Sequence, residues 1–201
     1  MYTAFLESGD WAVIPNMQAG GYLTINPDGL FEITGTSILD FDGDGVLDLW
    51  FRAESVRRRC RFTNSAVITG FATIVDGEVV QLLHGYITGG SIGGTFVTAR
   101  FNTETSEHLI MRGYFSGGWG GRLSGANLYS MHNGELTLEY WFERRHYMET
   151  IHEEAKELFW VNGEEVSEDD YNQFTSRFEW PSDDALIWES RNWDCDCDYD
   201  E

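Results

Sequence analysis

Cysteine and proline are scarce in this chain, with 3 of each among 201 residues. Cys60 stands alone, and Cys195 and Cys197 are one residue apart in a polar tail. That spacing provides neither a disulfide framework nor the paired ligands of a zinc site. No proline-rich or serine-rich linker divides the chain, so we expect one domain over residues 1–180, followed by an acidic, partly disordered tail over residues 181–201.

Long apolar runs are also missing. No stretch reaches the roughly 18 apolar residues of a membrane-spanning helix, so we expect no transmembrane segment. Met1 to Leu6 lack the charged and apolar regions of a signal peptide. The sequence therefore predicts a soluble chain that is either cytosolic or has lost an export segment upstream of Tyr2.

Basic residues are few, and the formal net charge is −21. The acidity is concentrated in residues 135–201, which contain 21 acidic and 5 basic residues, whereas residues 1–134 contain 13 and 8. Such a field repels phosphates and anionic membranes, so we expect no direct binding to nucleic acid. It favours a metal ion or a cationic partner. The run Arg57 to Arg59, with Arg61, is a local exception that we interpret as a solvated strand edge.

Aromatic residues are abundant, with 13 Phe, 9 Tyr and 8 Trp, and can fill a core. Three turn dipeptides, Asp76-Gly77, Asn133-Gly134 and Asn162-Gly163, are typical of two-residue hairpins because both positions require a positive φ. Short apolar runs between such turns predict a mainly β, β-rich α+β fold, an antiparallel sandwich or barrel. The expected strands are 31–39, 46–53, 61–75, 78–88, 95–101, 108–115, 126–130, 135–142, 157–161 and 164–166.

Two helices are predicted beside the strands. A short N-terminal helix covers Tyr2 to Glu7 and ends at Ser8-Gly9. Near the C-terminus, Ser167 is a helix N-cap followed by acidic residues in the first turn, where they favour the positive end of the helix dipole. We expect this second helix to extend to about Phe178 and to be ended by Pro181.

One motif predicts a ligand. From Asp40 to Asp48 the chain reads Asp-Phe-Asp-Gly-Asp-Gly-Val-Leu-Asp, with carboxylates at loop positions 1, 3, 5 and 9 and glycine at position 6. This is the spacing of a calcium loop, and chance would produce it in roughly 7 in 10,000 sequences of this composition. The predicted Ca²⁺ ligands are the side chains of Asp40, Asp42, Asp44 and Asp48, the last directly or through water, and the carbonyl of Val46.

The context of this loop differs from that of an EF-hand. Predicted strands rather than helices flank it, and position 12 is Phe51 instead of the bidentate glutamate. A further ligand must come from elsewhere, and Glu54, Asp28 or water are the candidates.

A glycine-rich pattern occurs twice. Gly85-Tyr86-Ile-Thr-Gly-Gly returns 28 residues later as Gly113-Tyr114-Phe-Ser-Gly-Gly. In one interpretation these are flexible loops on a rim, with Tyr86, Tyr114 and Trp119 as aromatic platforms for a ligand. In the other, they are hairpin turns that only glycine tolerates, and the rings belong to the core. The sequence leaves both open.

Two segments resemble known families. Asp40 to Leu49 resembles the calcium loop of FG-GAP and VCBS-type repeats and, less closely, of dockerins, which are extracellular. Phe159 to Tyr171, with its Asn-Gly-x-x-Val-Ser-x-x-x-Tyr pattern, is similar to the closing segment of secreted or lipid-anchored Firmicutes proteins that have such a loop upstream. The resemblance implies a calcium-binding protein of the cell envelope or the exterior and brings no catalytic residue. A single copy of the loop argues against a propeller built from repeats.

No catalytic motif is found. His152-Glu153 opens like a zincin motif, but Lys156 stands where the second histidine is required. We therefore predict a non-enzymatic domain, secreted or in the cell envelope, that binds a glycan or an envelope protein and uses calcium structurally. The alternatives are an acidic intracellular inhibitor or decoy of a basic nucleic-acid-binding protein, and a carbohydrate hydrolase with a carboxylate pair.

Overall fold

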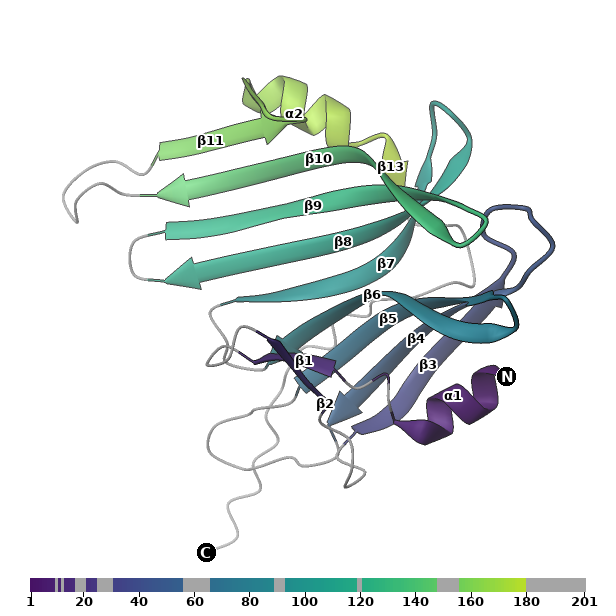
Figure 1. Cartoon of the computed structure of the whole chain (residues 1–201). Coiled ribbons are helices and arrows are strands. Elements are labelled where there is room, and N and C mark those ends of the chain that lie inside the picture. Colours follow the sequence, from purple (N-terminus) through teal and green to yellow (C-terminus); the bar gives the residue numbers. More distant parts are fainter. Residues whose placement is uncertain are drawn as a thin grey trace, which may run out of the picture.

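The computed structural model describes residues 1–9, 11, 13–16, 21–24, 31–55, 66–88, 93–118, 121–147 and 156–179. An 11-stranded antiparallel sheet dominates it, as the mainly β prediction requires (Figure 1). In chain order the elements are α1 (Tyr2–Ser8), β1 (Val13–Asn16), β2 (Gly21–Thr24), β3 (Phe31–Leu39), β4 (Asp48–Ser55), β5 (Ala66–Val75), β6 (Glu78–Thr88), β7 (Gly93–Asn102), β8 (Glu107–Gly118), β9 (Gly121–His132), β10 (Glu135–Tyr147), β11 (Lys156–Val161), β12 (Glu164–Val166), α2 (Glu168–Thr175) and β13 (Phe178–Glu179).

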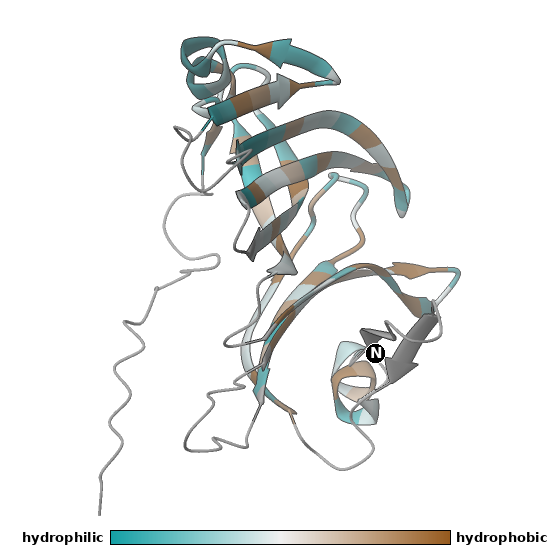
Figure 2. Cartoon of the chain, turned by 90° about the vertical axis from the view of Figure 1, so that its left-hand side faces the viewer, coloured by the Kyte–Doolittle hydropathy of each residue, from teal (hydrophilic) through white to brown (hydrophobic). Residues whose placement is uncertain are grey.

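The large sheet is a meander in which each strand from β3 to β12 pairs with its neighbour in the chain, and β13 pairs with β7. Strands β5 and β6 pair from Val75↔Glu78 to Ala66↔Thr88, whereas the described part of β6 and β7 shares one register pair, Ile87↔Gly94. The sheet therefore opens at this point into a first half (β3–β6) and a second half (β7–β12), which diverge in Figure 2. Of the two expected architectures, sandwich and barrel, the open sheet agrees with the sandwich.

The first half buries its apolar side chains against the N-terminal helix, in a cluster that we call the first core. Phe51 and Trp11 are 0% and 1% exposed, and their ring centroids lie 5.4 Å apart. Phe5 of α1 packs on the same phenyl ring at 6.0 Å. The prediction of an N-terminal helix is thus confirmed, and Gly9 ends it in the left-handed conformation with φ of 74°.

The second half has its own apolar layer under α2. Phe142 of β10 lies 5.9 Å from Tyr171 and 6.2 Å from Phe174, measured between ring centroids. Phe178 of β13 stacks on the same ring at 6.4 Å. The aromatic residues of the C-terminal segment are therefore part of the packing of the β-sheet.

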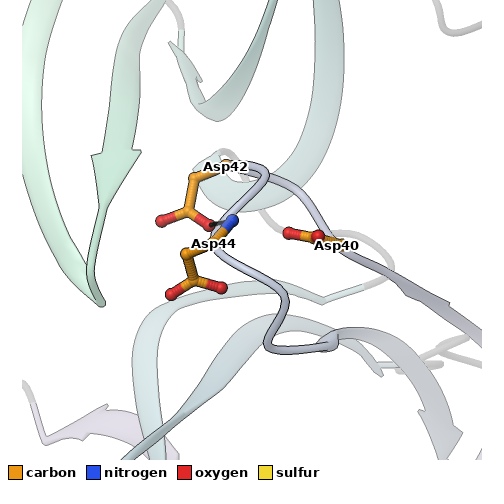
Figure 3. A group of neighbouring side chains, drawn as sticks. All are labelled: Asp40, Asp42 and Asp44. Carbon is orange, nitrogen blue, oxygen red and sulfur yellow. Dashed lines mark hydrogen bonds between the residues drawn. The ribbon is translucent and has the colours of Figure 1, made fainter.

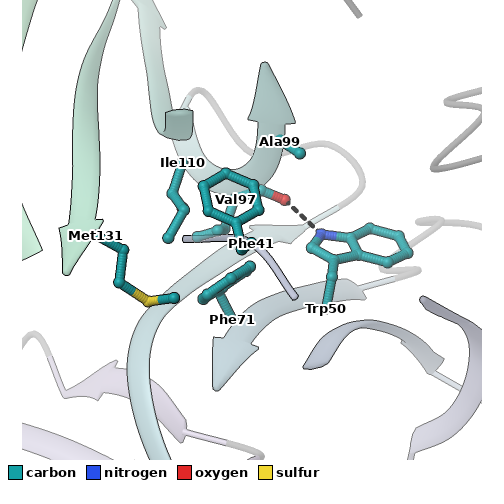
Figure 4. Packing of buried hydrophobic residues seen from close by; sticks show 7 residues of the cluster. All are labelled: Phe41, Trp50, Phe71, Val97, Ala99, Ile110 and Met131. Atoms are coloured by element: carbon teal, nitrogen blue, oxygen red, sulfur yellow. Dashed lines mark hydrogen bonds between the residues drawn. The ribbon is translucent and has the colours of Figure 1, made fainter. Parts of the chain in front are cut away.

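A third cluster, which we call the junction cluster, joins the two halves (Figure 4). Trp50 and Phe71 come from the first half, and Val97 and Ile110 from the second. The Trp50 indole N–H donates to the Val97 carbonyl at 3.0 Å, and the Val97 backbone N–H donates to Thr69 Oγ1 at 2.8 Å. Because backbone groups of β7 are satisfied by side chains of the first half, the junction is fixed by hydrogen bonds as well as by apolar contact.

The predicted hairpin turns are confirmed. Asp76, Asn133 and Asn162 have φ values of 52°, 51° and 50°, and the glycine after each also has a positive φ. These turns place β5 beside β6, β9 beside β10, and β11 beside β12.

The predicted end of the second helix was wrong. α2 ends at Thr175, and Phe178, the expected last residue of the helix, starts the short strand β13. The reason lies in a distant contact: the Thr103 N–H donates to the Arg177 carbonyl at 2.9 Å, and Phe178 pairs with Asn102 of β7. Pairing with the edge of β7 therefore ends the helix earlier than its apolar spacing predicts.

The N-cap of α2 allows a first test. Ser167 accepts a hydrogen bond from the Asp170 N–H at 3.1 Å, so replacing it with alanine leaves a helix donor without its partner. We expect Ser167→Ala to lower the free energy of unfolding by about 1 kcal/mol, measured by urea denaturation. Ser176→Ala, at the other end of the helix, is the control and should cost less; an equal loss would contradict the capping role.

Several predicted features lie outside the described residues. These are Cys60 and the arginine run, part of the expected strand 61–75, Trp119, Asp28, and the tail 181–201. Neither described helix is long and apolar enough to cross a membrane.

Candidate metal centre

The aspartate loop connects β3 to β4. The antiparallel pair Leu39↔Asp48 closes it, and Phe41 anchors it from inside. The Phe41 ring is 6% exposed and lies 5.3 Å from the ring of Phe71 in the junction cluster. With one apolar residue buried, the neighbouring aspartates are held at the surface.

Three carboxylates converge in this loop. Asp40, Asp42 and Asp44 each offer an oxygen, and these oxygens all lie within 4.8 Å of one another (Figure 3). Asp40 and Asp44 are exposed, and Asp42 is half-buried. Like charges at this separation repel one another, and a bound cation would relieve the repulsion. The three residues are the loop positions 1, 3 and 5 that the sequence predicted.

Backbone donors keep the carboxylates oriented. Asp40 accepts from the Gly43 N–H at 2.8 Å and from the Gly45 N–H at 3.1 Å. Asp44 accepts from the Val46 N–H at 2.6 Å. Gly43 and Gly45 have φ values of 76° and 85°, a conformation that side-chain-bearing residues rarely adopt. The two glycines of the motif are therefore required by the turn itself.

Asp42 also connects the loop to the second half of the sheet. Its Oδ2 accepts from the backbone N–H of Asn133 at 2.9 Å, across 91 residues of sequence. Asn133 belongs to the turn between β9 and β10. The loop thus touches both halves, a contact that no spacing in the sequence signals.

Asp48 differs from the other three aspartates. It is 1% exposed, and its Oδ2 accepts from the Phe41 N–H at 2.9 Å. Its Oδ1 has no hydrogen-bond partner among the described residues. Burial raises the pKa of this carboxyl, the Thr73 hydroxyl and the Phe41 N–H lower it, and the charges of Asp42 and Asp44 raise it further. The structure brings Asp40, Asp42 and Asp44 together at the surface and places Asp48 behind them.

The N-terminal helix lies against the same loop. The Tyr2 hydroxyl donates to the Leu47 carbonyl. Burial, followed by the charge of Asp48, raises the pKa of Tyr2 to about 12. α1 therefore contributes to both the first core and the loop.

Asp48 provides a prediction with a pH dependence. Because its pKa is raised in the folded state, ionisation of Asp48 opposes folding, and the stability associated with its neutral form is lost as pH rises through the folded pKa. In chelator at pH 7, Asp48→Asn should therefore be more stable than the wild type in urea denaturation. The difference should shrink on acidification towards 3.8, the ordinary pKa of the carboxyl.

Calcium should reverse the effect of this substitution. If Asp48 serves as a ligand, Asp48→Asn must gain less stability from the ion than the wild type gains. Asp76→Asn, at an exposed hairpin turn, is the control that should follow the wild type in both conditions. A lower stability of Asp48→Asn in chelator would contradict the cost of burying this charge.

The remaining predicted site residues have different surroundings. Glu54 pairs with Arg52 at 2.8 Å and follows Asp48 by six residues of extended strand, about 20 Å away, so it cannot complete the loop. Tyr86 packs against the first core. The Tyr114 hydroxyl lies within hydrogen-bond distance of Glu143 and Trp141. Trp119, the third predicted platform, lies outside the described residues.

The repeated glycine pattern has a structural origin. Gly85 and Gly113, the first glycines of the two copies, both lie in strands and both contact Phe96. A Cβ on Gly85 would lie 2.3 Å from the Phe96 Cα, and one on Gly113 would lie 2.2 Å from the Phe96 ring. These glycines make room for β7 at the opening of the sheet.

Sequence reasoning missed two contact sets. The Asn133 contact is non-local and leaves no pattern. The residues Trp141, Glu143 and Arg145, in contrast, alternate along β10 and so share one face of the sheet, a signal that was available. Comparison with family models, with curated proteins and with solved structures finds no match to this chain.

Proposed function

We propose that this chain is a non-enzymatic, calcium-binding domain of a secreted or cell-envelope protein, in which calcium stabilises the fold and another surface binds a glycan or a partner. The observation that carries the proposal is the convergence of Asp40, Asp42 and Asp44 in the glycine register of a calcium loop.

The donor set favours calcium over other cations. It consists of carboxylate oxygens, the ligands that Ca²⁺ and Mg²⁺ prefer, and contains neither sulfur nor imidazole. Ca²⁺ accepts six to eight ligands in flexible geometry, so the Val46 carbonyl, Asp48 and water can complete its shell. Mg²⁺ requires a near-ideal octahedron and usually keeps several waters, so a loop that offers this many protein oxygens suits it less.

The expected affinity supports a location outside the cell. The loop lacks a bidentate glutamate at position 12, and loops with fewer charged ligands bind calcium more weakly. A weak site fills where calcium is abundant, as it is in the extracellular medium. This reasoning agrees with the resemblance to extracellular calcium loops.

Direct titration tests the proposal. Isothermal calorimetry with CaCl₂ should give one ion per wild-type chain, unchanged by excess MgCl₂. The Asp42→Ala/Asp44→Ala variant should show no binding, because two of three converging ligands are removed. Glu164→Ala/Glu165→Ala removes the same charge from the exposed strand β12 and is the matched control. Absence of calcium binding to the wild type at millimolar concentration would refute the proposal.

A further inference from the structure

The two faces of β10 have different neighbours. Phe142 points towards α2, where its ring contacts Tyr171 and Phe174. Side chains alternate along a strand, so Trp141, Glu143 and Arg145 lie on the face opposite α2. Trp160 on the neighbouring strand β11 and Tyr114 on β8, which lies beyond β9, share that face, as their contacts with Arg145 and Glu143 show.

These side chains form a connected series of contacts. The Trp141 indole N–H donates to the Tyr114 hydroxyl at 2.9 Å, and that hydroxyl donates to Glu143 Oε2 at 2.9 Å. Arg145 Nε donates to the other oxygen of Glu143 at 2.6 Å. The guanidinium carbon of Arg145 lies 4.9 Å from the centroid of the Trp160 ring. We refer to Tyr114, Trp141, Glu143, Arg145 and Trp160 as the Trp-Arg face.

The inner part of this face is fixed. Glu143 is 6% exposed with both oxygens engaged, and burial raises the pKa of Tyr114 to about 12. Gly125 provides the space, since a Cβ there would lie 2.6 Å from the Tyr114 hydroxyl. Arg145 is therefore held in one orientation by a buried carboxylate and an aromatic ring, and little of its conformational entropy remains to be lost on binding.

The outer part of this face presents guanidinium donors beside aromatic rings. The Arg145 side chain is 51% exposed, and its two terminal nitrogens have no hydrogen-bond partner in the part of the chain that the structure describes. Trp141 and Trp160 are partly exposed beside it. Oriented donors next to apolar ring surfaces are the elements of a ligand-recognition site.

We propose that the Trp-Arg face binds a neutral oligosaccharide. This inference rests on the glycan-binding part of the proposed function. It keeps Tyr114 from the glycine-rich segments and places the rest of the contact surface on β10 and β11. A sugar ring presents C–H groups to an aromatic surface and hydroxyl oxygens to nearby donors, which matches the Trp160 ring and the terminal guanidinium nitrogens of Arg145.

The charges on this face select against ionic ligands. Glu143 already pairs with Arg145, so the guanidinium has no uncompensated charge for an anion, and the net charge of −21 repels anions further. A cationic ligand would meet Arg145 itself over the Trp160 ring. An apolar ligand would remove water from the terminal guanidinium nitrogens without replacing their hydrogen bonds. A polar, uncharged ligand with apolar patches satisfies all three conditions.

The experiment measures binding of defined sugars to the full chain with calcium present. The probes are cellohexaose, chitohexaose, xylohexaose and mannohexaose, with tri-galacturonate as the anionic comparison, followed by Trp fluorescence and calorimetry. We expect at least one neutral probe to bind and tri-galacturonate to fail. Arg145→Ala and Trp160→Ala should each weaken the neutral probe about tenfold or more, as at central contact residues.

Arg144→Ala is the matched control. Arg144 is the next residue along β10, pairs with Glu157 at 2.8 Å and lies over Phe159 on the α2 face. The Arg144→Ala variant should bind the sugar as the wild type does. Melting curves should show that Arg144→Ala, Arg145→Ala and Trp160→Ala are all folded. If either Arg145→Ala or Trp160→Ala is unfolded, Arg145→Lys and Trp160→Phe replace them. Arg145→Lys should weaken sugar binding as much as Arg145→Ala, because the point charge of lysine cannot reproduce the forked donors of the guanidinium.

Three results would overturn the inference. These are unchanged sugar binding in both Arg145→Ala and Trp160→Ala, a preference for tri-galacturonate, and no binding of any neutral probe at millimolar concentration. The calcium titration described above is independent of all three. A chain that binds calcium but no sugar would therefore reject the Trp-Arg face and leave the calcium site standing.

Discussion

Replacing Phe51 with alanine is expected to lower the free energy of unfolding by about 3 to 5 kcal/mol, the usual cost of truncating a buried phenyl ring. Phe51 is 0% exposed and packs on Phe5 and Trp11, while on its own sheet it fills the space over Gly70. A Cβ on Gly70 would lie 2.3 Å from the Phe51 ring, so this position of the sheet has no side chain that could fill the cavity.

Urea denaturation of Phe51→Ala against the wild type provides the measurement. Leu138→Ala is the control, because Leu138 is 53% exposed and its truncation should change the stability by about 0.5 kcal/mol or less. Equal losses in the two variants would show that α1 and Trp11 do not form a common core with the first half of the sheet.

Calcium is expected to raise the melting temperature of the wild type. An ion that binds only the folded state, at a concentration 100 times its Kd, adds about 2.7 kcal/mol, which for a chain of this length corresponds to roughly 5 to 10 °C. The ion should bind only the folded state because the loop is held by both halves, through Phe41 in the junction cluster and through Asp42 on Asn133.

Differential scanning calorimetry in calcium and in chelator measures this gain. Asp42→Ala/Asp44→Ala should melt at the same temperature in both solutions. In chelator its melting temperature should be close to that of the wild type, because the weaker repulsion between two carboxylates instead of four offsets the hydrogen bonds that Asp42 and Asp44 lose. Identical melting temperatures of the wild type in calcium and in chelator would show that calcium does not stabilise this fold.

Local chemistry explains which parts of the fold could be predicted from the sequence. Asp76, Asn133 and Asn162 each precede a glycine, and a positive φ at both positions leaves a two-residue hairpin as the favoured geometry. The calcium loop is equally local: its glycines and three converging aspartates lie within six residues. Features of this kind require no knowledge of the rest of the chain.

Contacts between distant residues explain what could not be predicted. The Phe174 and Phe178 spacing is helical, yet Phe178 lies in a strand because Asn102 of β7 offers a free edge. The Asp42 contact with Asn133 and the approach of Gly85 to Phe96 also arise from the path of the sheet. Periodicity reports the preference of a segment, whereas these contacts depend on its neighbours in space.

The order of the strands has a consequence for how the protein folds during its synthesis. Every strand of the meander from β4 to β12 pairs with the one made just before it, so the sheet can grow by adding hairpins, which form in about 1–10 μs. The first core, with α1, Trp11 and Phe51, is encoded within residues 1–88. Synthesis adds about 5–20 residues per second, so the first half has time to fold while the ribosome is still making the second. Among the described strands β13 is made last, so its pairing with β7, a strand of the middle of the sheet, forms after the others.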